Sequence, residues 1–125
     1  MMRDMDLIRE VLLEVEDKCH GYRGISFEVP RDDLEGENGR KAYHLGILVE
    51  GGFVEGDVTR DSSGICCVAE KLTWKGHEFL DAAREPKRWK QAKSLILDKA
   101  GGASIAVWTR VLLSQINENL GLVGG

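Results

Sequence analysis

A helix that ends at a pair of glycines and is followed directly by a β-hairpin is the feature that most constrains the fold of this chain. Apolar residues recur at helical spacing over Arg40–Glu50, and the two glycines after Glu50 end the helix. Apolar stretches over about 54–59 and 65–71 then flank a polar tip that contains a glycine, which is the pattern of a hairpin. We therefore interpret Arg40–Val54 as the end of a helix-turn-helix, and the hairpin as its wing.

Further elements are expected on both sides of this segment. They are a helix over Asp4–Lys18, a strand over Ile25–Val29, and helices over about 74–83, over 86–99 and from Ser104 onward. Residues 31–39 contain two glycines, so we expect a loop with about one helical turn there, and a turn or cap at Asn38-Gly39. This order predicts an α+β fold, a winged helix-turn-helix with additional C-terminal helices.

The chain has 125 residues, which fits a small domain with an extension. We expect a winged helix-turn-helix domain over 1–83, a helical extension over 84–120, and a tail over 121–125. The last helix carries more apolar surface than a winged core requires. The extension therefore either packs on the domain or forms a homodimer through the C-terminal helices, and the dimer is favoured slightly.

Cysteine usage and hydropathy bear on the compartment. The three cysteines are an odd number and two of them are adjacent, so a secreted disulfide framework is not expected. No apolar run approaches the roughly 18 residues that a membrane span needs. The beginning of the chain is too acidic and polar for a signal peptide. These features predict a cytoplasmic protein with reduced thiols and no membrane partner.

Three sequence segments resemble a known family. They are Arg-Asp-Met-Asp-Leu-Ile-Arg at 3–9, Tyr-His-Leu at 43–45 with Leu48, and the segment 72–82, which begins Leu-Thr-Trp and ends Gly-His-Glu-Phe-Leu-Asp-Ala, with Trp89 after it. Over about residues 3–96 the chain is similar to uncharacterised bacterial and prophage proteins that share a domain of unknown function. The resemblance implies a winged-helix fold and a phage or mobile-element setting, and it brings no established activity.

The fold class suggests binding to double-stranded DNA. A winged helix of this kind would place Arg40, Lys41, Tyr43 and His44 in the major groove and Arg60 of the wing on a phosphate. His44 is accordingly interpreted as a surface residue of the recognition helix. The predicted function is a non-enzymatic, transcriptional-regulator-like DNA-binding domain.

The charge distribution opposes DNA binding and supports an alternative. Residues 1–72 carry nine basic and sixteen acidic side chains, whereas residues 73–125 carry eight and five. DNA affinity depends strongly on basic side chains that neutralise phosphates. The alternative is an acidic protein-interaction module that binds a host protein or defence component.

Basic residues are concentrated near the start of the C-terminal extension. They are Arg84, Lys87, Arg88, Lys90 and Lys93. This stretch is either a surface for nucleic acid or an acidic partner, or a solvated helix face, and it could also pair with the acidic domain of a second subunit.

Catalytic and metal chemistry are not expected. Cys19, Cys66 and Cys67 include no Cys-x-x-Cys pair, and adjacent strand residues point to opposite faces, so we predict no metal site. No Ser-His-Asp grouping and no phosphate-binding glycine loop occur, so we predict no enzyme activity and no cofactor. Trp74 and Trp89 are interpreted as core or semi-core aromatics.

Overall fold

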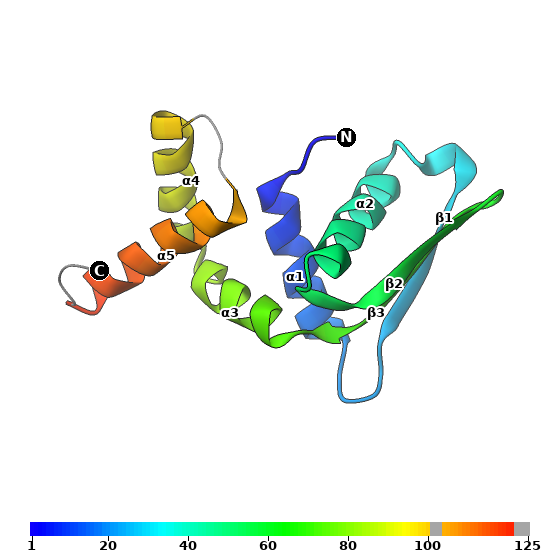
Figure 1. The fold of residues 1–125 in the computed structure, drawn as a ribbon, viewed down its shortest axis with the longest axis horizontal. Helices are drawn as coiled ribbons and strands as arrows, with labels where there is room; N and C mark the ends of the chain where they lie inside the picture. The colour runs from blue at the N-terminus through cyan, green and yellow to red at the C-terminus, as the bar shows by residue number, and fades with distance from the viewer. Residues whose placement is uncertain (101–103, 122–125) are drawn as a thin grey trace. The chain divides into compact units, whose positions relative to one another are not determined.

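A computed structural model describes residues 1–100 and 104–121 of the chain. The helices are α1 (Met5–Lys18), α2 (Glu37–Glu50), α3 (Trp74–Ala83), α4 (Pro86–Ala100) and α5 (Ile105–Asn119). The strands are β1 (Ile25–Pro30), β2 (Val54–Asp61) and β3 (Gly64–Leu72), with a 3-10 turn, η1, at Arg31–Asp33 (Figure 1). The chain divides into unit 1, Met1–His77, and unit 2, Glu78–Gly125.

The expected order of helices and strands is confirmed, and side-chain caps lie at the starts of several helices. The Asp4 carboxylate accepts hydrogen bonds from the backbone N–H groups of the first turn of α1. Thr73 Oγ1 accepts one from Gly76 N–H at the start of α3, and the Ser104 side chain does the same for Val107 in α5. Local capping chemistry therefore determines where these helices begin.

The three strands form one antiparallel sheet in the order β1-β3-β2. β2 and β3 are joined by a tight turn at Ser62-Ser63, and β1 pairs with the other edge of β3. Alternate residues of the outer strands are exposed, including Glu28 and Thr59, so helices cover one face of the sheet and the other faces solvent. This α+β arrangement is compatible with a winged-helix-like fold.

The start of α2 differs from the prediction. Asn38 and Gly39 do not form a turn before the helix but lie in its first turn, because α2 begins at Glu37. Gly39 explains the difference, since a Cβ at this position would overlap the backbone carbonyl oxygen of Leu34. The glycine lets the segment after η1 pass close to the helix. A helix-turn-helix has another helix before the one corresponding to α2, and here the short turn η1 lies in that place.

The core of unit 1 lies between α1, α2 and the sheet. Its most buried side chains are Ile8, Leu12, Val15, Val29, Leu45, Leu48, Val54 and Cys67. The Ile8, Leu12 and Val15 spacing is that of one helical face, so the amphipathic pattern of α1 determines which side packs inward.

Unit 2 has its own aromatic centre. The rings of Trp89 and Trp108 are stacked with centroids 4.3 Å apart, and Phe79 contacts Trp89 edge to face. The interpretation of Trp89 as a core residue is confirmed, since it is 4% exposed. The same interpretation of Trp74 is wrong: this side chain is 81% exposed because, directly after the capping Thr73, it lies on the outer side of the first turn of α3.

Candidate functional site

The first two basic residues of α2 are held by ion pairs within unit 1. Arg40 Nη2 lies 3.1 Å from Asp4 Oδ2, and Lys41 Nζ lies 2.6 Å from Glu14 Oε1. The Lys41 ammonium also lies 4.9 Å from the centre of the Phe27 ring. Both side chains predicted to enter a DNA groove are thus engaged by α1, and Lys41 also by β1.

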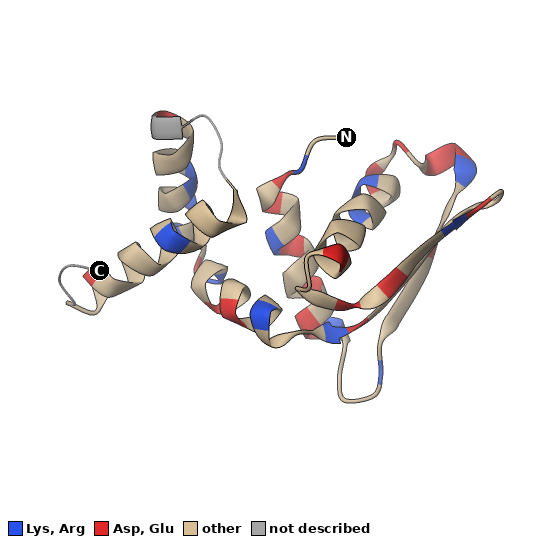
Figure 2. Ribbon diagram, viewed as in Figure 1, with Lys and Arg blue, Asp and Glu red and all other residues tan. Residues whose placement is uncertain are grey.

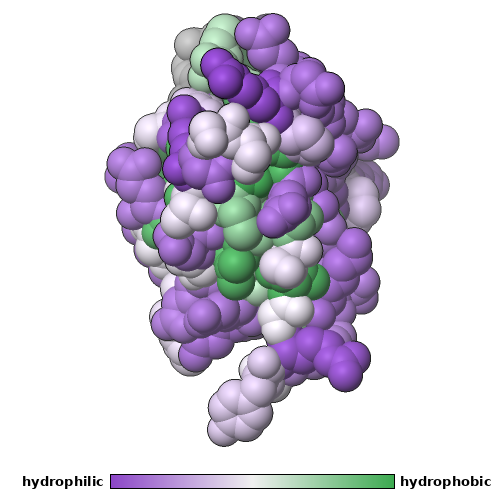
Figure 3. Space-filling view, turned by 90° about the vertical axis from the view of Figure 1, so that its right-hand side faces the viewer, coloured by the Kyte–Doolittle hydropathy of each residue, from purple (hydrophilic) through white to green (hydrophobic). Residues whose placement is uncertain are grey.

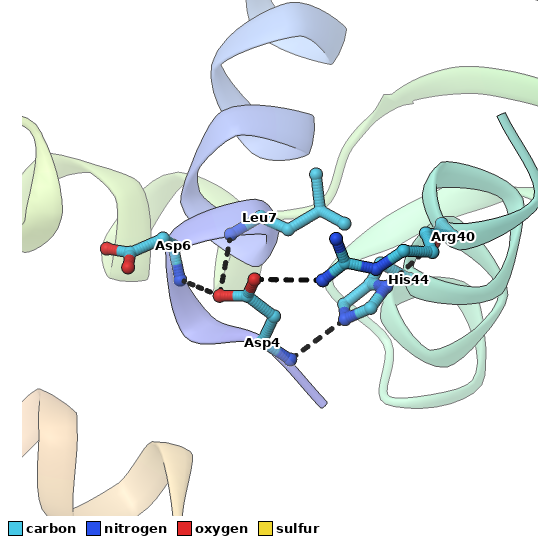
Figure 4. Close-up of polar contacts among 5 residues, drawn as sticks. All are labelled: Asp4, Asp6, Leu7, Arg40 and His44. Atoms are coloured by element: carbon cyan, nitrogen blue, oxygen red, sulfur yellow. Dashed lines mark hydrogen bonds and ion pairs between the residues drawn. The ribbon is translucent and has the colours of Figure 1, made fainter. Parts of the chain in front are cut away.

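His44 is not a surface residue, so its interpretation as a surface residue of the recognition helix is wrong. Its side chain is fully buried, with Nε2 accepting from Asp4 N–H at 2.9 Å and Nδ1 2.7 Å from Arg40 O. Because the carbonyl can only accept, Nδ1 carries the hydrogen and the ring is neutral in this arrangement. Figure 4 shows the imidazole and Arg40 both directed at the start of α1. His44 therefore joins α2 to α1.

The Glu14 carboxylate links Lys41 to Lys18 on its own helix. Burial alone would raise the pKa of Glu14, but hydrogen bonds and charge from the two lysines outweigh burial and leave the pKa below its ordinary value. The carboxylate is therefore ionised under ordinary conditions, and it neutralises the Lys41 ammonium.

The outward side of α2 is largely uncharged. Tyr43 and Ile47 are partly exposed, with Gly46 beside them, and they face Val58 and Ile65 of the hairpin across a hollow. Two adjoining hollows of about 390 and 320 Å³ make up this feature, which we call the α2–hairpin groove. In Figure 3, hydrophobic residues are grouped in the middle of the visible face and bordered by hydrophilic ones.

The two ends of the α2–hairpin groove differ in charge. Arg31 and Arg60 line the end near the hairpin tip, and Glu50 and Asp57 line the other end. Among the described residues, neither arginine side chain has an ion pair or hydrogen bond. Acidic positions otherwise predominate on this unit: Figure 2 shows them along α1, in η1 and on the hairpin.

Only part of the predicted DNA-binding set comes together. Tyr43 and Arg60 line the same hollow, whereas Arg40, Lys41 and His44 are directed toward α1. Sequence reasoning missed the apolar lining of the groove, made by Ile47, Val58 and Ile65, and it also missed Arg31. The signal available was the four-residue spacing of Tyr43 and Ile47, which puts both on one helix side.

The predicted basic surface lies in unit 2 and is not evenly exposed. Lys87 and Lys90 are exposed and three residues apart, so they share a side of α4, whereas Arg88 and Lys93 are partly buried. Arg84 pairs with Asp81 at 3.0 Å. This arrangement leaves Lys87 and Lys90 as the best-exposed pair.

Of the apolar side chains of the last helix that were expected to cover the core or form a dimer interface, Trp108 and Leu112 are buried, and Val111 and Ile116 are partly exposed. Leu95 and Leu97 of α4, and Val107 and Leu113 of α5, are exposed. A homodimer through the C-terminal helices stays a prediction.

The cysteines lie within unit 1 as free thiols. Burial raises the pKa of Cys67 to about 11, and it also raises the pKa of Cys19, whose Sγ lies 3.5 Å from Ala69 O. In the part of the chain that the structure describes, no three His, Cys, Asp or Glu side chains are grouped as a metal site would require. The same residues include no helix with the length and hydropathy to cross a bilayer.

Comparison with known proteins places the chain in a family. Residues 2–103 match the family described as "Hypothetical protein (DUF2513)". An "Uncharacterized protein" of Haemophilus influenzae is 28% identical over 120 residues, which cover 96% of this chain and 99% of that protein. No solved structure matches.

The fold and the groove thus define an α+β protein with a three-stranded antiparallel sheet and an apolar hollow beside α2. The chain belongs to the DUF2513 family.

Proposed function

We propose that this chain is a non-enzymatic, winged-helix-like protein-interaction module, and that it docks a partner protein in the α2–hairpin groove. The observation that carries the proposal is the orientation of α2. Its basic side chains form ion pairs with Asp4 and Glu14 of α1, while its outward side presents Tyr43 and Ile47 to the groove.

The surface chemistry suits a protein better than a nucleic acid. A DNA-reading helix needs free cationic and hydrogen-bonding side chains, and a large share of DNA affinity comes from basic groups that neutralise phosphates. Freeing Arg40 for DNA would remove the ion pair of Asp4 beside the phosphates, and freeing Lys41 would leave Glu14 with Lys18 alone. Grouped apolar side chains with a polar border are instead typical of protein interfaces.

Double-stranded DNA is the second candidate ligand, and one observation favours it. Arg60 is exposed near the hairpin tip and its side chain has no partner among the described residues, as expected of a wing residue that contacts a phosphate. Under this alternative, replacing Arg40 and Lys41 with alanine lowers duplex affinity and flattens its salt dependence. Under the docking proposal, the same replacement changes neither the affinity for duplex DNA nor its salt dependence.

The proposal is tested by affinity capture with matched surface variants after nuclease treatment. Ile47→Glu places a charge in the groove, and Ser26→Glu places the same charge on the solvent face of the opposite edge strand, β1. We expect the wild type and Ser26→Glu to retain the same protein and Ile47→Glu to lose it. Equal retention by all three proteins, or retention that disappears on nuclease treatment, contradicts docking at the groove.

A further inference from the structure

We infer that the α2–hairpin groove takes an extended peptide segment of the partner, paired along the free edge of β2, with an acidic residue near the hairpin tip and a basic residue at the opposite end. This inference rests on the proposed docking function and names the chemistry of the partner segment.

The first argument is the free strand edge. β2 pairs with β3 on one side, and among the described residues no strand pairs with its other side. An edge strand presents unpaired backbone donors and acceptors to which an extended peptide can add. Because α2 packs against β2, a peptide on this edge has the side of a helix beside it, and the helix provides the second wall of the groove (Figure 1).

The second argument is the space along that wall. Gly46 lies in the middle of α2, and a Cβ there would meet only a Val58 methyl, at 3.9 Å. The missing side chain leaves a shallow hollow bordered by Ile47 and Ile65. An aliphatic side chain of a bound peptide would fill this hollow, and the next residue of an extended peptide would point away from it.

The third argument is the charge at each end of the groove. Arg31 and Arg60 have no ionic partner among the described residues, and a carboxylate can accept paired hydrogen bonds from a guanidinium group. The neighbouring Asp61 carboxylate does not pair with them, because its Oδ1 accepts hydrogen bonds from Ser63 and Gly64 within the turn. Glu50 at the other end favours a lysine or arginine. The two ends together specify which end of the groove the acidic residue and the basic residue of the peptide occupy, for either direction of its chain.

The test is selection of random dodecapeptides displayed on phage against the immobilised full-length chain. We expect enriched peptides to carry an acidic residue, then alternating aliphatic residues, then a basic residue, or the same order reversed. The enriched peptide is then synthesised with a fluorescent label, and its affinity is measured by anisotropy. Enrichment of peptides without an acidic residue, or no enrichment, overturns the inference.

Variants separate this inference from the docking proposal. Reversing both charges with Arg31→Glu and Arg60→Glu should lower the affinity for the labelled peptide about tenfold or more. A lysine in place of the acidic residue of the peptide should restore that affinity. N-methylation of alternate peptide residues should weaken binding similarly if the peptide pairs with β2. Gly46→Leu, which fills the hollow without adding charge, should abolish binding, and Ser26→Glu, on the exposed side of the opposite edge strand β1, should not.

The possible outcomes are distinct. If Gly46→Leu abolishes binding but charge reversal and N-methylation do not, the groove binds partners by another chemistry, and this inference fails alone. If Gly46→Leu leaves peptide affinity unchanged, the groove is not the docking site and the proposed function fails as well.

Discussion

Replacement of His44 by alanine should destabilise unit 1 far more than replacement of its neighbour Arg40. The His44 ring is fully buried and bridges Asp4 N–H and Arg40 O, which belong to segments 36 residues apart along the chain. Truncation to alanine leaves a cavity and deprives the Asp4 N–H of its acceptor. Truncation of large buried side chains costs about 2–5 kcal/mol, and an unsatisfied buried donor about 1–3 kcal/mol. Because Asp4 is only partly buried, water can hydrate its N–H in the variant, so we expect a total loss at the lower end of the combined range, about 3–5 kcal/mol.

Two further variants divide this effect into its parts. His44→Leu retains most of the volume but cannot accept a hydrogen bond, so we expect a loss of about 1–3 kcal/mol. Arg40→Ala removes an ion pair whose side chains are 48% and 38% exposed, and exposed pairs contribute about 0–1 kcal/mol. The expected order of destabilisation is therefore His44→Ala, then His44→Leu, then Arg40→Ala.

Urea unfolding followed by circular dichroism measures these differences. Because the chain has two units, amide hydrogen exchange in the first turn of α1 should be measured alongside, since faster exchange there assigns the loss to unit 1. A loss below about 1 kcal/mol for His44→Ala would refute the buried bridge. So would an Arg40→Ala loss as large as that of His44→Ala.

Three other predictions concern unit 1. Glu14→Gln should lower stability at neutral pH and flatten the pH dependence of stability in acid. The pKa of Glu14 is lowered in the folded protein, so its ionised form contributes stability that is lost as pH falls from the ordinary carboxylate range through that pKa. Parallel wild-type and variant stability curves would contradict this. Gly39→Ala should destabilise unit 1 by about 1–3 kcal/mol, because the new Cβ meets the carbonyl oxygen of Leu34. Gly46→Ala should stabilise it by about 0.5–1 kcal/mol, because a Cβ there has room. Thermal unfolding of both variants checks the contrast, which fails if the two midpoints shift in the same direction. Thiol labelling at pH 8 should modify partly exposed Cys66 well before Cys67, whose pKa is raised to about 11 by burial, and equal rates would disprove the buried position.

The elements of the fold were predictable because their signals are local. Asp4, Thr73 and Ser104 cap helices through contacts within a few residues, and the hairpin follows from its polar tip and flanking apolar stretches. The start of α2 was missed because it depends on a close approach between Gly39 and Leu34. Such an approach is a tertiary feature, and a glycine in the sequence reads equally well as a turn.

The candidate site was only partly predictable, because the partners of its side chains lie far along the chain. Arg40, Lys41 and His44 have the spacing and chemistry of a recognition helix, but each is engaged by Asp4, the cap of α1, or by Glu14 within it. A single sequence gives no sign of those pairs. Tyr43 and Arg60 were identified individually, and the groove that joins them required the packing of α2 on β2.

The most direct test of the docking account is photo-crosslinking from a single position in the groove. A benzophenone amino acid at position 47 should form a covalent adduct with a protein, and the same group at position 26, on the exposed side of the opposite edge strand β1, should not. The adduct should persist after nuclease treatment and disappear when Gly46 is replaced by leucine. Adducts with nucleic acid at position 47, or equal protein adducts at both positions, would contradict the account.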